Sequence, residues 1–136
     1  MREGGLLESI ESVVADIRFI NPFNISFTHN LACDIESLSR NKKITLFRIV
    51  QEQTKNIIKY SNAKNVAISI ACTSEYIQLV ITDDGIGFDT KNTKRGLGLS
   101  HIYERTQLEN GKVLLDAASG KGCRLEIHIP MEVKNG

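Results

Sequence analysis

Residues 65–87 carry the sequence NVAISIACTSEYIQLVITDDGIG, and this stretch decides the fold. Residues 65–72 and 76–83 are both apolar and rich in β-branched side chains, which is typical of strands. Only Thr73-Ser74-Glu75 separates them, so the two strands form a hairpin. The hairpin ends in two carboxylates and a turn with two glycines.

The segments around this hairpin show either helical or strand periodicity. Apolar residues recur on one helical face in residues 6–20, 42–61 and 97–108. In the second of these helices the stripe comprises Leu46, Ile49, Val50, Gln53, Ile57 and Tyr60. Strands are predicted at residues 23–28, 112–118 and 123–130, the last two as a second hairpin around Ser119-Gly120-Lys121-Gly122.

The order of these elements predicts the fold class. Most strands are joined as hairpins, and residues 29–40 and 88–94 read as a polar loop and a mobile loop. We therefore expect an α+β fold, a two-layer α/β sandwich. Its mixed, mostly antiparallel five-stranded sheet would carry about three helices on one face. The chain has no GxGxxG after its first strand and no GxxxxGK[ST], which disfavours Rossmann and P-loop folds.

Composition limits the classes of partner. A chain of 136 residues is most simply one domain, and 17 Lys and Arg against 16 Asp and Glu leave a net charge of +1. Such a balance, with no basic stripe, argues against nucleic acid and anionic lipid as partners. The three cysteines, Cys33, Cys72 and Cys123, have no CxxC spacing. We predict reduced, mostly buried thiols, no membrane-spanning segment and a cytoplasmic location.

Asp83 ends a predicted strand immediately before Gly85 and Gly87. A carboxylate at a strand end can accept a hydrogen bond from a ligand donor such as an exocyclic amine. The glycines permit a sharp turn and the close approach of a flat ring. Taken alone, the segment is more simply a turn.

A second glycine-rich segment, Arg95-Gly96-Leu97-Gly98-Leu99, enters the predicted helix 97–108. Free N–H groups at a helix N-terminus suit phosphate oxygens, and Lys94 and Arg95 would add positive charge. His101 lies one turn further and is within reach of a phosphate. The simpler interpretation is a flexible turn with a helix cap and a solvent-facing histidine.

Glu52, Asn56 and Lys59 lie at i, i+4 and i+7 on the flank of the apolar stripe of helix 42–61. The Asn56 side-chain oxygen is a ligand suited to Mg²⁺, and Glu52 could orient or deprotonate an incoming nucleophile or water. Lys59 could pair with a phosphate. This helix alone would be read as a surface helix with a polar edge, but the three segments in this order make a nucleotide pocket the leading hypothesis.

The three segments together resemble the catalytic, ATP-binding domain of two-component sensor histidine kinases, which has the Bergerat fold. Residues 47–60 resemble the N box, residues 83–88 the G1 box and residues 95–99 the G2 box of that family. The stretch 111–130 is similar to the closing hairpin of the family. The short segment between the last two boxes resembles the subgroup of nitrate-sensor and desaturase-sensor kinases.

The resemblance implies a role for each residue of the pocket. Asp83 would receive the adenine amino group, and Asn56 would coordinate an Mg²⁺ that bridges the ATP phosphates. Glu52 would help to activate the phosphate acceptor, while Lys59 and Tyr60 would border the phosphates and the ribose. The remaining nucleotide-binding residues would be Gly85, Gly87, Arg95, Gly96, Leu97, Gly98 and Leu99.

The implied reaction is transfer of the γ-phosphoryl group of ATP to a histidine on a dimerisation domain. Residues 1–20 resemble only the helix that trails from such a domain, so we expect residues 21–131 to be the ATP-binding domain and 132–136 a frayed tail. The isolated domain would be a monomer without its own phosphoacceptor. The full-length protein would be a homodimer with a response regulator as its downstream partner, and a missing N-terminal part could anchor it to a membrane.

Two other functions stay open on the same fold. One is a serine kinase similar to those that regulate sigma factors. The other is a non-catalytic module that senses a nucleotide or binds another protein. Gln51-Glu52 of the N box and the terminal hairpin favour the histidine kinase over the serine kinase. The presence of Glu52, Asn56 and Asp83 argues against the non-catalytic module.

Overall fold

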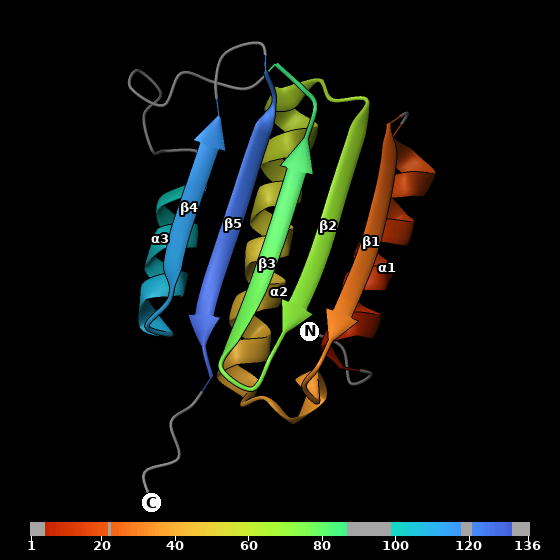
Figure 1. The fold of residues 1–136 in the computed structure, drawn as a ribbon. Coiled ribbons are helices and arrows are strands. Elements are labelled where there is room, and N and C mark those ends of the chain that lie inside the picture. The colour runs from red at the N-terminus through yellow and green to blue at the C-terminus, as the bar shows by residue number, and fades with distance from the viewer. Residues whose placement is uncertain (1–4, 22, 87–98, 118–120, 132–136) are drawn as a thin grey trace, which may run out of the picture.

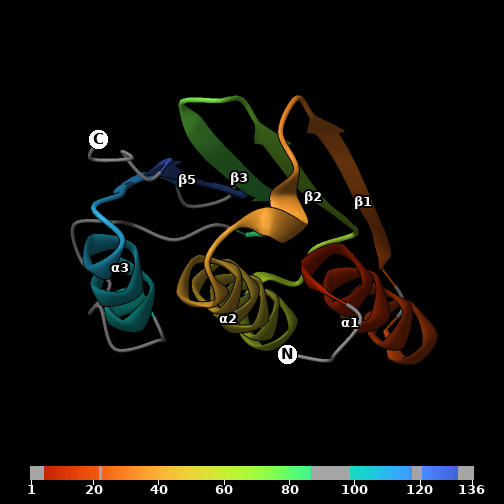
Figure 2. The ribbon, with the colours of Figure 1, turned by 90° about the horizontal axis from the view of Figure 1, so that it is seen from below.

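The computed structural model describes residues 5–21, 23–86, 99–117 and 121–131, and these form two layers (Figure 1). Three α-helices lie on one face of a five-stranded sheet, as the view from below shows (Figure 2). The helices are α1 (Leu6–Ile20), α2 (Arg40–Asn56) and α3 (Leu99–Leu108). The strands are β1 (Asn24–Leu31), β2 (Asn65–Cys72), β3 (Tyr76–Asp83), β4 (Lys112–Ala117) and β5 (Cys123–Pro130). The predicted α+β two-layer sandwich is confirmed.

The sheet has the order β1-β2-β3-β5-β4 and mixed strand directions. β2 with β3 and β4 with β5 form the two predicted antiparallel hairpins, and β3 also pairs antiparallel with β5. β1 pairs parallel with β2, and the chain crosses between them through α2, because parallel strands need a long crossover connection. The ends of β3 and α2 therefore meet at one edge of the sheet, the upper edge in Figure 1.

Side chains alternate between the two faces of the central strands. The face toward the helices is apolar, and eight of its side chains are at most 1% exposed: Ile68, Ile70, Ile77, Leu79, Ile81, Leu125, Ile127 and Ile129. Burial of these side chains between sheet and helices supplies the main favourable term in folding.

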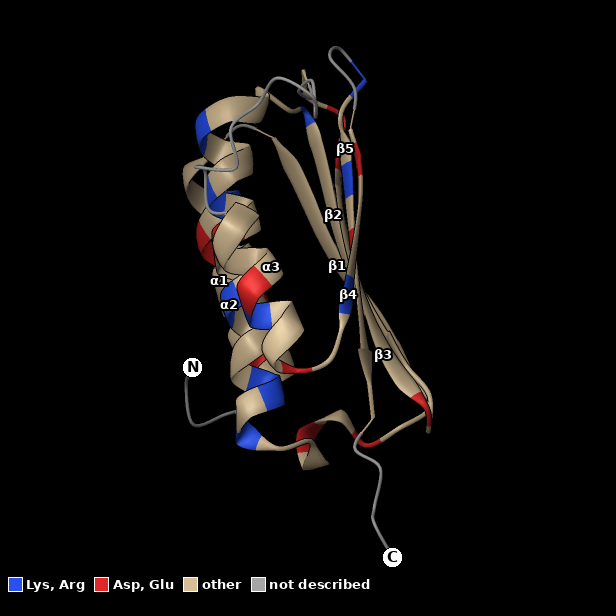
Figure 3. Cartoon of the chain, turned by 90° about the vertical axis from the view of Figure 1, so that its left-hand side faces the viewer, with Lys and Arg blue, Asp and Glu red and all other residues tan. Residues whose placement is uncertain are grey.

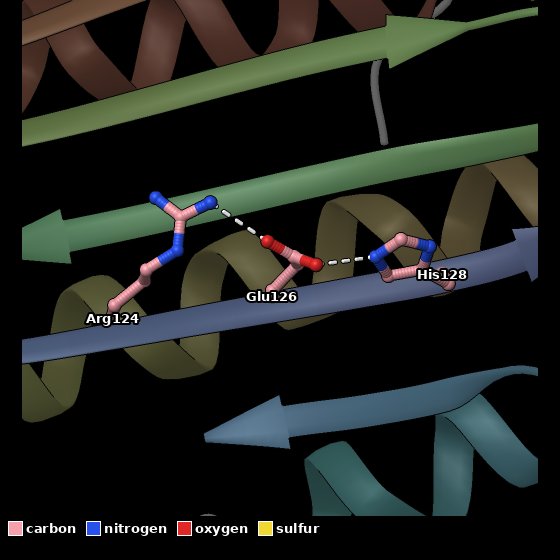
Figure 4. Close-up of polar contacts among 3 residues, drawn as sticks. All are labelled: Arg124, Glu126 and His128. Atoms are coloured by element: carbon pink, nitrogen blue, oxygen red, sulfur yellow. Dashed lines mark hydrogen bonds and ion pairs between the residues drawn. The ribbon is translucent and has the colours of Figure 1, made fainter. Parts of the chain in front are cut away.

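The opposite face of the sheet carries polar side chains. On β5, Arg124 Nη2 donates to Glu126 Oε1 at 2.7 Å, and the His128 ring bonds to the second Glu126 oxygen (Figure 4). These hydrogen bonds, from His128 first and then Arg124, lower the pKa of Glu126. The Tyr76 ring stacks on His128 from the neighbouring strand. A polar outer face of this kind is typical of a sheet that packs on one side only.

Charged residues of both signs are interspersed along the helices (Figure 3). One pair among them is largely buried: Lys42 Nζ lies 2.9 Å from Glu109 Oε2, and the side chains are 7% and 15% exposed. Lys42 lies in the first turn of α2, whose N-terminus is capped by Ser39, and Glu109 follows α3. The pair therefore joins these two helices away from water.

The predicted helix 42–61 differs in its second half. The α-helix begins at Arg40 and ends at Asn56, and a π-helical segment, η2 (Ile57–Ser61), continues it to Asn62, which has φ +53°. The wider turn changes the direction of the following side chains, so Tyr60 leaves the apolar stripe and is 49% exposed. The placement of Tyr60 within the buried stripe was therefore wrong, because a pattern of period 3.6 does not reveal a π-helical segment.

The region predicted as a polar loop at residues 29–40 is also more ordered than expected. β1 continues to Leu31, and a short 3₁₀ helix, η1 (Ile35–Ser37), follows. Glu36 of η1 accepts a hydrogen bond from Leu6 N at 2.8 Å, which satisfies a free N–H at the start of α1. The buried face of α1 comprises Leu6, Ser9, Ile10, Val14 and Ile17.

The prediction of three reduced thiols is wrong for two of them. Cys33 and Cys72 form a disulfide with a Cα–Cα distance of 5.7 Å, and Cys123 is free and buried. The parallel pairing of β1 with β2 places Leu31 opposite Cys72, and Ala32 N donates to Cys72 O at 2.9 Å. Since parallel pairing across a crossover leaves no local sequence signal, the 39-residue separation concealed this proximity.

Some predicted features fall outside the described residues. They are the loop at residues 88–94, the first part of the glycine-rich segment 95–99, and the tail 132–136. No helix in the described part of the chain is long and apolar enough to cross a membrane.

Lys42→Met tests the ion pair between α2 and α3. We expect the free energy of unfolding to fall by about 3 kcal/mol, because the substitution leaves the Glu109 carboxylate largely buried without its cation. Urea unfolding measures the change. The double variant Lys42→Met/Glu109→Met should recover most of the loss. If the free energy of unfolding of Lys42→Met falls by less than about 0.5 kcal/mol, the pair contributes no more than a solvent-screened surface ion pair.

Alkylation in denaturant tests the disulfide. Without a reductant we expect one labelled thiol per chain, from Cys123, and three after reduction, as intact mass will show. In Cys33→Ser/Cys72→Ser the count should be one in both conditions. Three labelled thiols in the unreduced wild-type protein would contradict the pairing.

Candidate functional site

The residues predicted for the pocket converge on one end of the sheet. α2 and η2 bring Glu52, Asn56, Lys59 and Tyr60 there, and β3 ends there at Asp83 (Figure 1). The start of β5 lies at the same end, because Cys123 is the register partner of Asp83.

Asp83 is a buried carboxylate, 8% exposed, at the last position of β3. Its Oδ1 accepts a hydrogen bond from Gly85 N at 2.9 Å. Burial raises the pKa of Asp83, the Gly85 hydrogen bond partly opposes this, and the neighbouring charge of Asp84 adds to the rise. A desolvated acceptor in this position is suited to a ligand that brings a hydrogen-bond donor.

Asp84 has the opposite environment although it is the next residue. It is exposed, and its Oδ1 accepts from the backbone N–H groups of Lys64 and Asn65, both at 2.8 Å. Its Oδ2 accepts from Asn65 Nδ2 at 2.8 Å. The Asn65 and Lys64 hydrogen bonds lower the pKa of Asp84. Asp84 therefore ties the start of β2 to the end of β3, which leaves Asp83 as the ligand-binding candidate.

Two glycines allow close backbone contacts around Asp83. A Cβ at Gly85 would lie 2.2 Å from Ser61 O, the carbonyl that accepts a hydrogen bond from Ile86 N at 2.7 Å. A Cβ at Gly122, where φ is +76°, would lie 2.2 Å from Asp83 O. In this structure Gly85 thus permits the close approach of η2. The sharp turn and the approach of a flat ring, expected of Gly85 and Gly87, stay predictions.

The polar flank of α2 and η2 is partly accessible. Glu52 and Asn56 are half-buried, as their position beside the apolar stripe predicted, while Lys59 and Tyr60 are exposed. His101 Nδ1 of α3 lies 3.9 Å from Glu52 Oε1. α2 and α3 thus place an imidazole beside the carboxylate predicted to activate a phosphate acceptor.

Part of the predicted site lies outside the described residues: Gly87, Arg95, Gly96, Leu97 and Gly98. Leu99 is described, is 6% exposed and begins α3. Its side chain is thus in the core.

Two residues that were not predicted for the pocket lie beside Asp83. Cys123 is 7% exposed, and its pKa is raised to about 12, first by burial and then by the Asp83 charge. Gln53 of α2 is 4% exposed, and its Nε2 lies 3.9 Å from Cys123 Sγ. The sequence did offer a signal that Gln53 belongs to the pocket, because a glutamine is unusual within an apolar helical stripe. For Cys123 the register between β3 and β5 was needed, which the sequence does not reveal.

A cavity of about 330 Å³ opens beside these residues, a volume at the lower end of those that hold small ligands. Its lining comprises Thr82, Asp83, Asp116, Ala117, Lys121, Gly122, Cys123 and Arg124. Glu52 and Asn56 are not among the described residues that line it. The cavity therefore lies at the ends of β3, β4 and β5, and the polar flank of α2 lies outside it.

Comparison with known proteins assigns this arrangement to a family. Residues 41–133 match the sequence profile described as histidine kinase-, DNA gyrase B- and HSP90-like ATPase. The chain belongs to this family. The match includes α2, which carries Glu52 and Asn56, the β2–β3 hairpin, which ends at Asp83, and the closing hairpin.

The relatives of this chain are longer proteins. It is 34% identical over 130 residues to the sensor histidine kinase ComP of Bacillus subtilis, covering 93% of this chain and 17% of ComP. It is 29% identical over 102 residues to the histidine-protein kinase/phosphatase DegS of the same organism, covering 72% of this chain and 26% of DegS. The chain thus spans about a fifth of the length of these relatives.

Solved structures share the fold. The histidine kinase domain of the Erythrobacter litoralis EL346 blue-light activated kinase superposes with a TM-score of 0.73 at 15% identity, covering 93% of this chain and 61% of that one. The Acinetobacter baumannii histidine kinase AdeS gives 0.70 at 19% identity, covering 95% and 66%. At these identities the likeness shows the fold alone.

The two adjacent carboxylates should respond to pH in opposite ways. The raised pKa of Asp83 contributes stability below the unfolded value of 3.8, and this is lost as pH rises through the folded pKa. The free energy of unfolding of Asp83→Asn should therefore rise relative to that of wild type as the pH rises from about 3 to about 7. Urea unfolding at several pH values measures the difference.

Asp84→Asn is the matched control with the opposite sign. The lowered pKa of Asp84 contributes stability above its unfolded value of 3.8, which is lost as pH falls through the folded pKa. This variant should be less stable than wild type at neutral pH and approach it in acid. The same pH trend in both variants would contradict the assignment of different roles.

Proposed function

We propose that this domain binds ATP together with Mg²⁺ and transfers the γ-phosphoryl group to a histidine on a separate dimerisation domain. The observation that carries the proposal is the buried Asp83 carboxylate, 8% exposed at the end of β3, in a chain of this family. Because it accepts only one backbone hydrogen bond among those described, it can receive the exocyclic amine of adenine.

The chemistry of the α2 flank fits a magnesium ion that is held mostly by the nucleotide. Asn56 supplies an amide oxygen and Glu52 a carboxylate one turn away, both half-buried. Within the described residues no group of three or more His, Cys, Asp or Glu is placed to hold a metal. Mg²⁺ commonly takes one or two protein ligands and completes its shell with phosphates and water, so Asn56 is the proposed ligand.

The remaining roles follow from position along α2 and η2. Bound Mg²⁺ would neutralise charge on the transferring phosphoryl group. Glu52 would orient the attacking histidine and accept its proton, and His101, 3.9 Å away, would help to hold that carboxylate in place. Lys59 and Tyr60, both exposed, would border the phosphates and ribose. The glycines and neighbours outside the described residues, Gly87, Arg95, Gly96, Leu97 and Gly98, would contact the phosphates.

The partners are part of the same proposal. ComP and DegS are named as histidine kinases, and the chain covers 17% and 26% of them. We therefore propose that this domain acts on a dimerisation domain outside residues 21–131 and that a response regulator receives the phosphoryl group. The cytoplasm is the proposed location, and α1 (Leu6–Ile20) is the proposed connection to the dimerisation domain.

Calorimetric titration of Asp83→Asn with ATP in Mg²⁺ tests the proposal. We expect the dissociation constant to rise at least about tenfold, because the variant replaces one acceptor oxygen with a donor toward the adenine amine. Asp16→Asn, an exposed carboxylate on α1, is the control and should bind as wild type does. Unchanged binding by Asp83→Asn would overturn the adenine assignment.

Asn56→Ala separates the metal from the base. We expect about a tenfold loss of ATP affinity with Mg²⁺ present and little change in EDTA, because the variant removes an oxygen ligand and no base contact. Asn41→Ala, exposed in the first turn of α2, is the matched control. Equal losses with and without Mg²⁺ would contradict the metal role.

Phosphotransfer distinguishes the histidine kinase from the other candidates. Incubation with labelled ATP and a supplied histidine-kinase dimerisation domain should give an acid-labile phosphohistidine. Nucleotide binding without transfer would favour the non-catalytic module, and an acid-stable phosphoserine on a protein partner would favour the serine kinase.

A further inference from the structure

Gln53 is a polar side chain enclosed between α2 and the sheet. It is 4% exposed, and its neighbours along the buried face of the helix are Ile49, Val50 and Ile57. Its Nε2 has a partner, the Cys123 thiol, at 3.9 Å. Its Oε1 is buried and has no hydrogen-bond partner among the described residues.

An unpaired amide oxygen in such a position calls for an explanation. Buried acceptors in folded proteins are almost always hydrogen-bonded, and leaving one unpaired costs stability. An apolar side chain of the same length would fill this space without that cost. Within the described residues this position therefore holds an acceptor that a bound molecule could satisfy.

The location of Gln53 indicates which molecule that is. Gln53 and Asp83 share Cys123 as a neighbour. Gln53 Nε2 contacts the Cys123 sulfur, and Cys123 is the register partner of Asp83 in the β3–β5 pair. The Asp83 charge also raises the pKa of that thiol, as expected for near neighbours. The Gln53 oxygen, unpaired among the described residues, and the buried Asp83 carboxylate are thus two acceptors at the same end of the sheet. Asp83 and Cys123 line the cavity there, and Gln53 adjoins it through its contact with Cys123.

We infer that Gln53 Oε1 is a second acceptor for the nucleotide base, which it reads together with Asp83, and that the pair selects purines with a 6-amino group. This inference rests on the proposed nucleotide-binding function. The exocyclic amine of adenine carries two N–H donors, one for each acceptor. A 6-oxo purine presents a carbonyl oxygen at the same place, which would leave both protein oxygens unpaired and facing a third acceptor.

The test compares ADP with IDP, which differ in the base only at the 6-position and the adjacent N1 proton and are not turned over. The wild-type domain should prefer ADP. Gln53→Met, similar in length but without the oxygen, should weaken ADP binding about tenfold and leave IDP binding unchanged or tighter, so the ADP-over-IDP preference falls at least about tenfold. Gln107→Met, the same change on the exposed face of α3, should leave both constants at their wild-type values.

Thermal unfolding of the ligand-free protein supplies a second readout. Gln53→Met should unfold at the same temperature as wild type or higher, because the unpaired oxygen is removed and the space stays filled. A purely structural glutamine would give the opposite pattern, a lower unfolding temperature with the ADP-over-IDP preference intact, and that result would overturn the inference. If Gln53→Met does not fold, Gln53→Leu carries the same nucleotide comparison.

The outcomes separate this inference from the proposed function. A wild-type domain that binds neither ADP nor IDP would refute the nucleotide site itself. If wild type prefers ADP and Gln53→Met keeps the same ADP-over-IDP preference, the role of Gln53 is refuted. The nucleotide site and the role of Asp83 would then stand.

Discussion

The backbone at the end of β3 is pressed between two other backbone segments, and the candidate site depends on this contact. On one side Gly85 leaves no room for a side chain against the Ser61 carbonyl, and Ile86 N donates to that same carbonyl. On the other side Gly122 adopts a positive φ and approaches the Asp83 carbonyl equally closely. Three elements distant in sequence, η2, β3 and β5, are thereby joined at the point where the Asp83 carboxylate is held.

At this junction the two adjacent carboxylates, Asp83 and Asp84, have opposite environments. Asp84 accepts three hydrogen bonds from Lys64 and Asn65 at the start of β2, so its charge is stabilised by the fold. Asp83 has the Gly85 hydrogen bond and burial, so its charge is disfavoured. The domain thus keeps two groups that reduce its own stability at the end of a well-packed core: the buried Asp83 carboxylate and the Gln53 oxygen, which has no partner among the described residues. Such local departures from good packing are expected where a protein binds a ligand.

Several features could be predicted from the chain alone because their signals are local. The hairpin strands β2 and β3 and the strand β5 were placed at their observed bounds by β-branched content and short connections. Glu52 and Asn56 were placed beside the apolar stripe of α2 by helical spacing, and both are half-buried there. Tyr60 was misplaced because the π-helical segment after Asn56 changes the spacing on which the prediction relied.

The sequence by itself determined the element types, the hairpins, the family resemblance and the residues able to bind a nucleotide, because each depends on neighbours within a few positions. Only the tertiary structure decided the features that join distant segments. Parallel pairing of β1 with β2 brought Cys33 to Cys72, and the register of β3 with β5 set Cys123 opposite Asp83. Packing of α2 on the sheet then enclosed Gln53 beside that thiol. The physical reason is that strand register and helix packing are settled by the whole core at once, and no short stretch of chain contains that information.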